Sequence, residues 1–196
     1  MGPRSSASLR LISDPRPRPV VPTPVLGMLL FVVAEAMMFA GLISAFTIVK
    51  AGDLGWPPPG QPRLPVEATA FNTAVLLLSA VFLFLANRRF GMARELARRP
   101  LFAAMGLGVF FVCFQGYEWI SLIRQGLTLT SSNHGSFFYL IVGMHGLHAL
   151  AGLAVLGRAA WKLSRGLLAP STFVAAQLFW YFVVGLWPIL YALVYL

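Results

Sequence analysis

Five long stretches of apolar side chains alternate with short polar connections along this chain. The stretches run over residues 25–49, 66–86, 101–123, 135–159 and 172–196. Because a helix rises about 1.5 Å per residue, each stretch is long enough to cross a hydrocarbon core about 30 Å thick. A helix also satisfies its own backbone hydrogen bonds in lipid. The pattern therefore predicts an all-α, polytopic membrane helix bundle, with one five-helix transmembrane domain over residues 25–196.

The composition agrees with a membrane protein and excludes other classes. Of the 196 residues, 58% are hydrophobic and 11% are charged, against about 45–50% apolar and about 25% charged residues in a soluble domain. The net charge of +9 comes from short basic clusters between the apolar stretches. Such clusters are typical of membrane topology rather than of nucleic-acid binding, so we expect no nucleic-acid partner. The single cysteine, Cys113, excludes a disulfide within the chain.

Residues 1–24 form a proline-rich tail before the first apolar stretch. Five prolines lie between Pro15 and Pro24, and no short apolar core precedes a small-residue cleavage site. The tail therefore does not resemble a cleavable signal peptide. We expect it to be disordered and cytoplasmic.

Lysine and arginine are distributed unevenly between the two ends of the predicted helices. Twelve of the 15 lie in the tail and in the connections after the second and fourth stretches. The other three are Lys50, Arg63 and Arg124. Because cytoplasmic loops carry the excess of positive charge, the N-terminus is expected in the cytoplasm and the C-terminus outside. The outer loop around "GWPPPG" should be irregular, with Trp56 near the headgroups.

One carboxylate, Glu35, lies about midway along the first stretch, within "FVVAEAMMFAGL". A charged carboxylate at the centre of a bilayer costs about 2.5–3.5 kcal/mol, so this side chain should face protein or water. Two interpretations stay open. Glu35 is either a neutral acid that closes a helix–helix hydrogen bond, or a group that takes part in proton movement.

The fourth stretch contains two histidines, His145 and His148, within "GMHGLHALAG". Residues three apart lie on the same helix face, and their depth is similar to that of Glu35. We therefore expect the three side chains to form a hydrogen-bonded cluster, with small residues nearby that favour close approach of another helix. A metal site would be incomplete, because zinc or copper needs three or four ligands and His134 is expected at the outer surface. Two histidines on one helix face also cannot flank one haem iron.

The other polar residues in the stretches are more typical of structure than of chemistry. The segment "QGYEWISLIR" places Gln115 and Glu118 three residues apart near the outer leaflet, and we expect Glu118 to pair with Arg124 or a loop amide. Three residues of the second stretch are typical of interhelical hydrogen bonds: Asn72, Thr73 and Ser79. The sequence shows no nucleophile beside a base, no paired carboxylates, no Cys/His metal spacing and no phosphate loop. We therefore expect no catalytic residue and no metal ligand.

Several motifs of the chain resemble subunit III of the haem-copper oxidases. They are "FVVAEAMMFAGLISAF", "FNTAVLLLSA", the outer loop "GWPPPG", "CFQGYEWIS", "GSFFYLIVGMHGLHALAG" and "FWYFVVGLWPILY". The resemblance extends over about residues 27–196, and residues 137–152 are its most specific part.

The resemblance implies a short, five-helix bacterial form that lies in the inner membrane. It implies that the chain binds no haem or copper, packs directly on oxidase subunit I, and leaves the haem and copper to the partner subunits I and II. It also implies a phospholipid bound in a cleft and support for proton uptake during oxygen reduction. By motif position, Glu35 is the family's buried carboxylate, His145 and His148 are its paired histidines, and Gln115 and Glu118 are its outer-end pair. The electron donor, cytochrome c or quinol, stays open.

The last helix departs from the family pattern. Aligning Trp180 with the family's tryptophan places Tyr181 at a usual histidine and Val184 at a usual aspartate. Trp180 and Tyr181 are expected to make interhelical contacts. The departure leaves a subunit III-like accessory protein of a nitric oxide reductase as one alternative.

Two functions of other classes also stay open. One is a stand-alone transporter or proton channel, although transporters commonly show internal repeats and broken helices and the sequence shows neither. The other is an independent haem-binding electron carrier.

Overall fold

The structure, a computed structural model, describes residues 20–52 and 62–196. Its α-helices are α1 (Thr23–Gly52), α2 (Val66–Met92), α3 (Arg98–Arg124), α4 (Asn133–Ser164) and α5 (Pro170–Val194), and a short 3₁₀ helix, η1 (Arg94–Ala97), precedes α3. Across these described ranges there is no strand, and five helical spans are long and apolar enough to cross a membrane. The expected all-α, five-span architecture is therefore confirmed. Most of the predicted tail and the loop around Trp56 lie outside the described residues.

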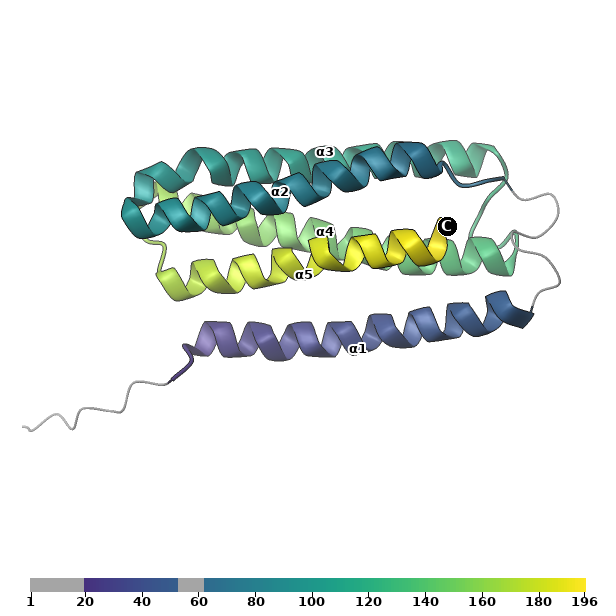
Figure 1. The fold of residues 1–196 in the computed structure, drawn as a ribbon, viewed down its shortest axis with the longest axis horizontal. Helices are drawn as coiled ribbons and strands as arrows, with labels where there is room; N and C mark the ends of the chain where they lie inside the picture. Colours follow the sequence, from purple (N-terminus) through teal and green to yellow (C-terminus); the bar gives the residue numbers. More distant parts are fainter. Residues whose placement is uncertain (1–19, 53–61) are drawn as a thin grey trace, which may run out of the picture.

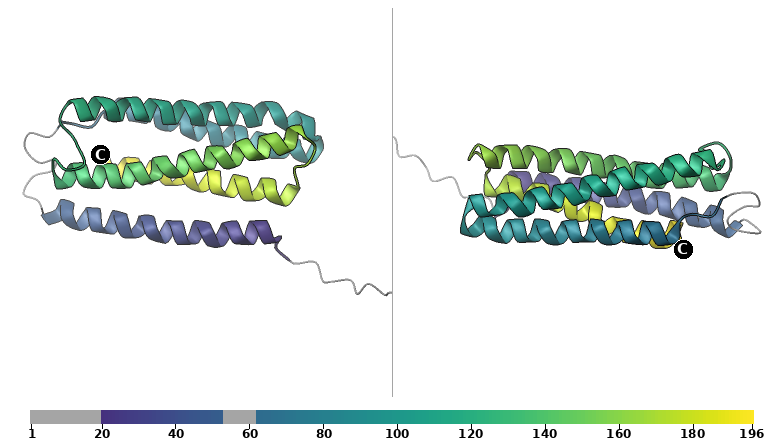
Figure 2. Two further views of the ribbon diagram at one scale, coloured as in Figure 1. Left: turned by 180° about the vertical axis from the view of Figure 1, so that it is seen from behind. Right: turned by 90° about the horizontal axis from the view of Figure 1, so that it is seen from above.

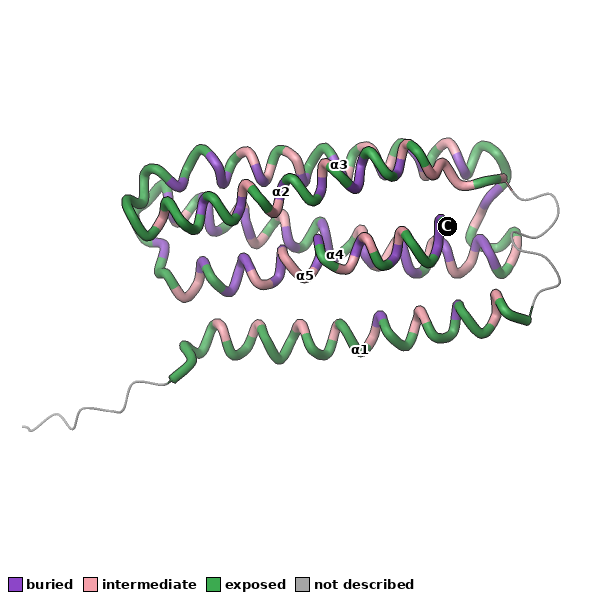
Figure 3. The backbone as a smooth tube through the Cα atoms, viewed as in Figure 1, coloured by how far each residue is buried: buried purple, intermediate pink, exposed green. Residues whose placement is uncertain are grey.

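Two antiparallel hairpins form the body of the bundle (Figures 1 and 2). Helices α2 and α3 form one hairpin, α4 and α5 form the other, and the hairpins pack side by side through α2–α5 and α3–α4 contacts. Helix α1 lies against α4 and α5, on the side away from the first hairpin. Only Phe39 and Phe46 of α1 are buried, and Figure 3 shows most of this helix as exposed. The core therefore lies between α2, α3, α4 and α5, and α1 is a peripheral helix.

The core is built from large apolar side chains that are almost completely buried, among them Leu76, Phe111, Phe138, Trp180 and Trp187. Outside it, large apolar side chains also cover the surface of every α-helix, for example Met37, Phe71 and Leu147. An apolar exterior over an apolar core is what a lipid-facing bundle needs, because the bilayer interior replaces water around the helices.

Glycines make room for two tryptophan rings inside the bundle. A Cβ atom added to Gly108 would lie 2.7 Å from the ring of Trp180, and one added to Gly152 would lie 2.8 Å from it. A Cβ atom on Gly146 would lie 3.3 Å from the ring of Trp119. The small residues of α4 were expected to admit a neighbouring helix, and Gly146 and Gly152 admit indole rings from α3 and α5.

The helices at the arginine-rich end run beyond the predicted apolar limits. Helix α2 continues to Met92 rather than ending at residue 86, and α4 continues to Ser164 rather than ending at residue 159. The Arg88 guanidinium lies 6.0 Å from the centre of the Phe84 ring. Because arginine side chains can lie along apolar surface while their charge reaches the headgroups, a helix can pass the limit of the hydrocarbon without a break.

The bundle has two chemically different ends. The connections α2–α3 and α4–α5 lie at one end, which we call the basic end because it carries Arg88, Arg89, Arg94, Arg98, Arg99, Arg158, Lys162 and Arg165. The end of α1, the α3–α4 connection and the end of α5 lie at the opposite end, with Lys50, Arg63 and Arg124.

Candidate functional site

Glu35 and His148 meet across the seam between α1 and α4. Glu35 Oε2 lies 2.9 Å from His148 Nε2, and His148 Nδ1 lies 2.8 Å from the carbonyl oxygen of Met144. A carbonyl oxygen can only accept, so Nδ1 carries a proton and donates it to Met144. The contact between Nε2 and Glu35 therefore needs one further proton, which resides on either the carboxyl group or the imidazole. The pair thus shares a single proton.

The surroundings of this pair are apolar. The His148 ring centre lies 5.3 Å from that of Phe39 and 6.3 Å from that of Phe179. The side chains of His148 and Glu35 are 11% and 18% exposed. With one shared proton the pair carries no net charge, whichever group holds the proton, so it avoids the cost of a lone buried charge.

His145 does not join Glu35, contrary to the expected three-residue cluster. Its ring lies 4.9 Å from that of Trp187 and 6.3 Å from that of Phe111. Among the described residues neither of its ring nitrogens has a hydrogen-bond partner. Residues three apart on a helix differ by about 60° in direction, and this difference turns His148 toward Glu35 of α1 and His145 toward Trp187 in the core.

Gln115 and Glu118 belong to a buried polar cluster near the opposite end of the bundle. Glu118 Oε2 accepts hydrogen bonds from Thr69 Oγ1 at 3.1 Å and from Gln115 Nε2 at 3.1 Å. Gln115 Nε2 also lies 3.1 Å from the hydroxyl oxygen of Tyr195. The cluster joins α2, α3 and Tyr195 after α5. The Glu118 carboxylate accepts hydrogen bonds from two neighbouring side chains, as expected of a structural contact.

Glu118 was expected to pair with Arg124 or a loop amide, and its side-chain partners in the structure are different. Arg124 is exposed at the end of α3, and the partners of Glu118 are Thr69 and Gln115. Arg124 lies six residues further along α3, which places it about 240° round the helix from Glu118.

Polar side chains of α2 fasten this helix to α3 and α5. Asn72 donates to the Phe111 carbonyl at 3.1 Å. The indole N–H of Trp187 donates to Thr73 at 2.9 Å, and that of Trp180 donates to Ser79 at 3.1 Å. Both tryptophans of α5 thus have a polar partner as well as an apolar pocket, as is typical of interhelical contacts.

Tyr181, which was grouped with Trp180, behaves differently. Its ring is partly buried against the core, and its buried hydroxyl has no hydrogen-bond partner within residues 20–52 and 62–196. Val184, which stands where the family usually has an aspartate, is buried among apolar side chains. Neither residue supplies the polar contact that a histidine and an aspartate would give.

The sequence interpretation missed Thr69, Trp187 and Tyr195 as partners in these contacts. Thr69 precedes Asn72 and Thr73 by three and four residues, a spacing that places all three on one helix face, so a signal was present. Tyr195 gave no such signal, because its contact with Gln115 depends on how α5 packs against α3.

The described residues contain no group of three or more His, Cys, Asp or Glu side chains that could hold a metal ion. Glu35 and His148 supply only two such side chains, because the third expected member, His145, faces away from them. His134, which was expected at the outer end of its helix, lies in the first turn of α4 at the end opposite the basic end, and its side chain is 2% exposed.

Comparison with known proteins gives a consistent result. The family described as "Cytochrome c oxidase subunit III" matches residues 19–196. A protein of Nocardia farcinica described as "Probable cytochrome c oxidase subunit 3" is 32% identical, over 98% of this chain and 95% of its own length. The cytochrome c oxidase subunit 3 of Synechocystis sp. is 30% identical, over 87% and 74% of the two chains. That of Dasypus novemcinctus is 33% identical, over 86% and 67%.

Proposed function

Because this chain belongs to the cytochrome c oxidase subunit III family, we propose that it is the cofactor-free subunit III of a bacterial terminal respiratory oxidase. In this role it lies in the plasma membrane with its basic end in the cytoplasm. It packs directly on subunit I and, together with subunit II, completes a complex that reduces oxygen to water and pumps protons. The haem and copper belong to the partner subunits.

The contact between Glu35 and His148 is the observation that supports this role most directly. Helix α1 buries only Phe39 and Phe46, so apolar packing holds it less firmly than the other helices. The hydrogen bond of 2.9 Å between Glu35 and His148 adds a specific tie to α4. A fixed α1 presents one defined outer surface to the rest of the complex, and in this way the subunit stabilises subunit I.

We also propose that Glu35 supports proton uptake by the complex. The pair holds one shared proton, and a second proton would convert it into a neutral carboxyl group beside an imidazolium. The change would leave the hydrogen bond to the Met144 carbonyl in place. Glu35 is 18% exposed, so a group of a partner subunit that packs on α1 can reach it.

The variant Glu35→Gln separates a proton-related role from a structural one. A glutamine amide can still donate to His148 Nε2, but it cannot take up or release a proton. For a proton-related role, we expect the Glu35→Gln complex to keep its thermal stability and lose sustained turnover. Turnover that matches the unmodified complex would leave Glu35 with a structural role only.

Lipid binding is a further part of the proposal. A groove of about 260 Å³ between α3 and α4 is lined mainly by apolar side chains, among them Phe111, Trp119 and Leu150. Its lining suits an acyl chain. The assignment predicts that the purified complex retains phospholipid. It also predicts that Gly146→Leu, which fills the groove, lowers the amount of phospholipid retained.

The test of the whole proposal is a gentle affinity purification from native membranes, followed by an absorbance spectrum and activity assays. We expect a haem- and copper-bearing partner that consumes oxygen, with reduced cytochrome c and quinol compared as donors. A haem-bearing partner that reduces nitric oxide instead would assign the chain to a reductase, the alternative that Tyr181 and Val184 keep open. A colourless chain that purifies alone and moves protons in liposomes would identify a channel.

A further inference from the structure

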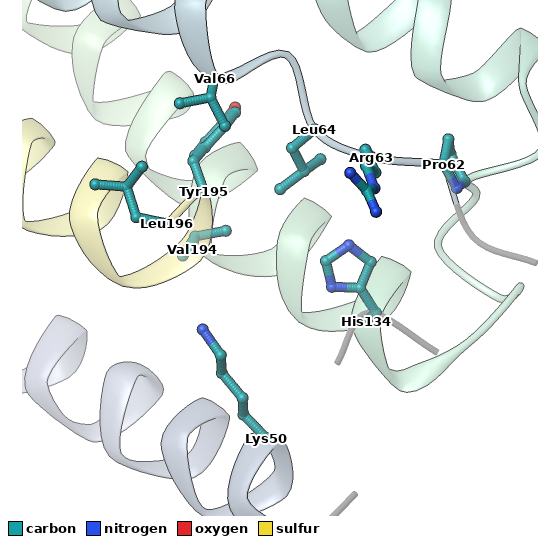
Figure 4. Close-up of a pocket in the computed structure, with 9 residues that line it drawn as sticks. All are labelled: Lys50, Pro62, Arg63, Leu64, Val66, His134, Val194, Tyr195 and Leu196. Atoms are coloured by element: carbon teal, nitrogen blue, oxygen red, sulfur yellow. The ribbon is translucent and has the colours of Figure 1, made fainter. Parts of the chain in front are cut away.

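A cavity at the opposite end of the bundle gathers basic side chains from three separate segments (Figure 4). Its volume is about 390 Å³. Lys50 enters from the last turn of α1, Arg63 from the segment before α2, and His134 from the first turn of α4. In Figure 4 the side chains of Arg63 and His134 point toward one another across the cavity, and Lys50 extends into it from below.

No acidic side chain of the described residues lines this cavity. Glu35 and Glu118 have hydrogen-bond partners elsewhere, and Glu95 lies at the basic end. Glu67 is exposed in the first turn of α2, outside the lining residues. Lys50 makes one long contact of 3.4 Å with a backbone carbonyl of α5, which leaves further donor capacity on its ammonium group.

The remaining lining residues of the cavity are apolar apart from Tyr195. Leu64, Val66 and Val194 line it, and Ile48, one turn before the end of α1, is 73% exposed on the neighbouring surface. The ends of the membrane-spanning helices meet here. Cationic groups above an apolar wall, at the depth where helices leave the hydrocarbon, match a molecule with an anionic head and an apolar tail.

We propose that this cavity binds the phosphate-bearing headgroup of an anionic phospholipid. Lys50 and Arg63 supply the two cationic contacts, His134 borders the phosphate, and the glycerol and first methylene groups continue along the apolar wall toward α1. The bound headgroup joins α1 to the α2–α3 hairpin, which α1 otherwise barely contacts. This inference rests on the membrane assignment in the proposed function and adds the headgroup class and its position.

Native mass spectrometry of the intact, delipidated complex tests the inference. The complex is titrated with phosphatidylglycerol and, in parallel, with phosphatidylcholine of the same acyl chains. We expect a preference for phosphatidylglycerol that falls about tenfold or more in Lys50→Gln/Arg63→Gln, because the double variant removes both cationic contacts to the phosphate. The single variants should each lose part of the preference.

Arg124→Gln is the matched control, because it removes one positive charge from the same end outside the cavity. We expect it to bind phosphatidylglycerol as the unmodified complex does. Equal retention of the two lipids by the unmodified complex would overturn the inference without any variant. An equal loss in Arg63→Gln and Arg124→Gln would also overturn it, because it would show a general charge effect.

Competition with inorganic phosphate distinguishes a lipid headgroup from a free anion. If millimolar inorganic phosphate displaces phosphatidylglycerol completely, the cavity binds a free anion and the lipid assignment is wrong. If the lipid is retained, its apolar part contributes to binding as proposed. The haem spectrum of the same preparation reports on the proposed function separately, so the two can fail independently.

Discussion

At the scale of single residues, the tautomer of His148 decides what the buried carboxylate can do. The Met144 carbonyl fixes the proton on Nδ1, at 2.8 Å, and leaves Nε2 to interact with Glu35. An aspartate in place of Glu35 would be too short to keep this geometry. The pair is therefore sensitive to side-chain length as well as to charge.

Glu35→Ala should destabilise the complex. The substitution leaves His148 Nε2 without its partner in an apolar seam, and an unsatisfied buried polar group costs about 1–3 kcal/mol. Thermal unfolding of the purified complex, followed by the loss of the haem spectrum, measures the effect. Glu35→Gln serves as the control that keeps the hydrogen bond, and an unchanged melting temperature for the alanine variant would contradict a structural role.

Gly152→Ala should also lower stability, for a reason of packing. The new Cβ would lie 2.8 Å from the Trp180 ring, and overpacking of a core typically costs about 1–3 kcal/mol. Gly106→Ala in α3 is the control, since nothing lies within 4 Å of its added Cβ. Equal melting temperatures for the two alanine variants would show that the ring of Trp180 moves aside freely.

At the scale of the helices, α2 and α5 are joined by pairs of tryptophan and hydroxyl side chains. Trp187 donates to Thr73 and Trp180 to Ser79, from two positions along α5. Two such bonds at different depths oppose both sliding and rotation of one helix against the other. The register between the two hairpins follows from these contacts.

A double-mutant cycle on Trp187→Phe and Thr73→Val should therefore show coupling. We expect an interaction energy of about 0.5–1.5 kcal/mol, the usual range for a hydrogen bond between membrane helices. Unfolding in mixed micelles provides the measurement. A cycle that pairs Trp161→Phe with Thr73→Val should be additive, because Trp161 is exposed at the basic end. If the effects of Trp187→Phe and Thr73→Val were additive, the hydrogen bond between the two residues would contribute nothing to stability.

The five helices could be predicted from the sequence because each apolar stretch meets the demands of the bilayer by itself. The similar depths of Glu35 and His148 follow from their places along the first and fourth stretches, whereas the packing of α1 beside α4 does not follow from the sequence pattern. The contact of Glu118 with Thr69 could not be predicted, since Thr69 lies on another helix and the rotation of α2 against α3 depends on packing. The same holds for His145, whose orientation depends on the contact of its ring with that of Trp187.

At the scale of the whole molecule, the two ends of the bundle differ in charge, and this difference predicts the orientation. Thr130→Cys at the opposite end and Ser164→Cys at the basic end, each in a Cys113→Ser background, can report it. In intact cells a membrane-impermeant maleimide should label Thr130→Cys and spare Ser164→Cys, because we propose that the basic end faces the cytoplasm. Permeabilised cells should label both. Labelling of Ser164→Cys alone in intact cells would reverse the orientation.

The position of α1 has a consequence for how the protein is made. Helix α1 is synthesised before α2 and α3, yet its main contacts are with α4 and α5, which follow them in the chain. The α2–α3 hairpin is complete before either partner of α1 exists. During synthesis α1 therefore lacks its contacts within this chain, and Glu35 has no His148 to pair with until α4 is inserted. Biogenesis of this subunit thus includes an interval in which a lone membrane carboxyl group must be kept neutral by its own proton.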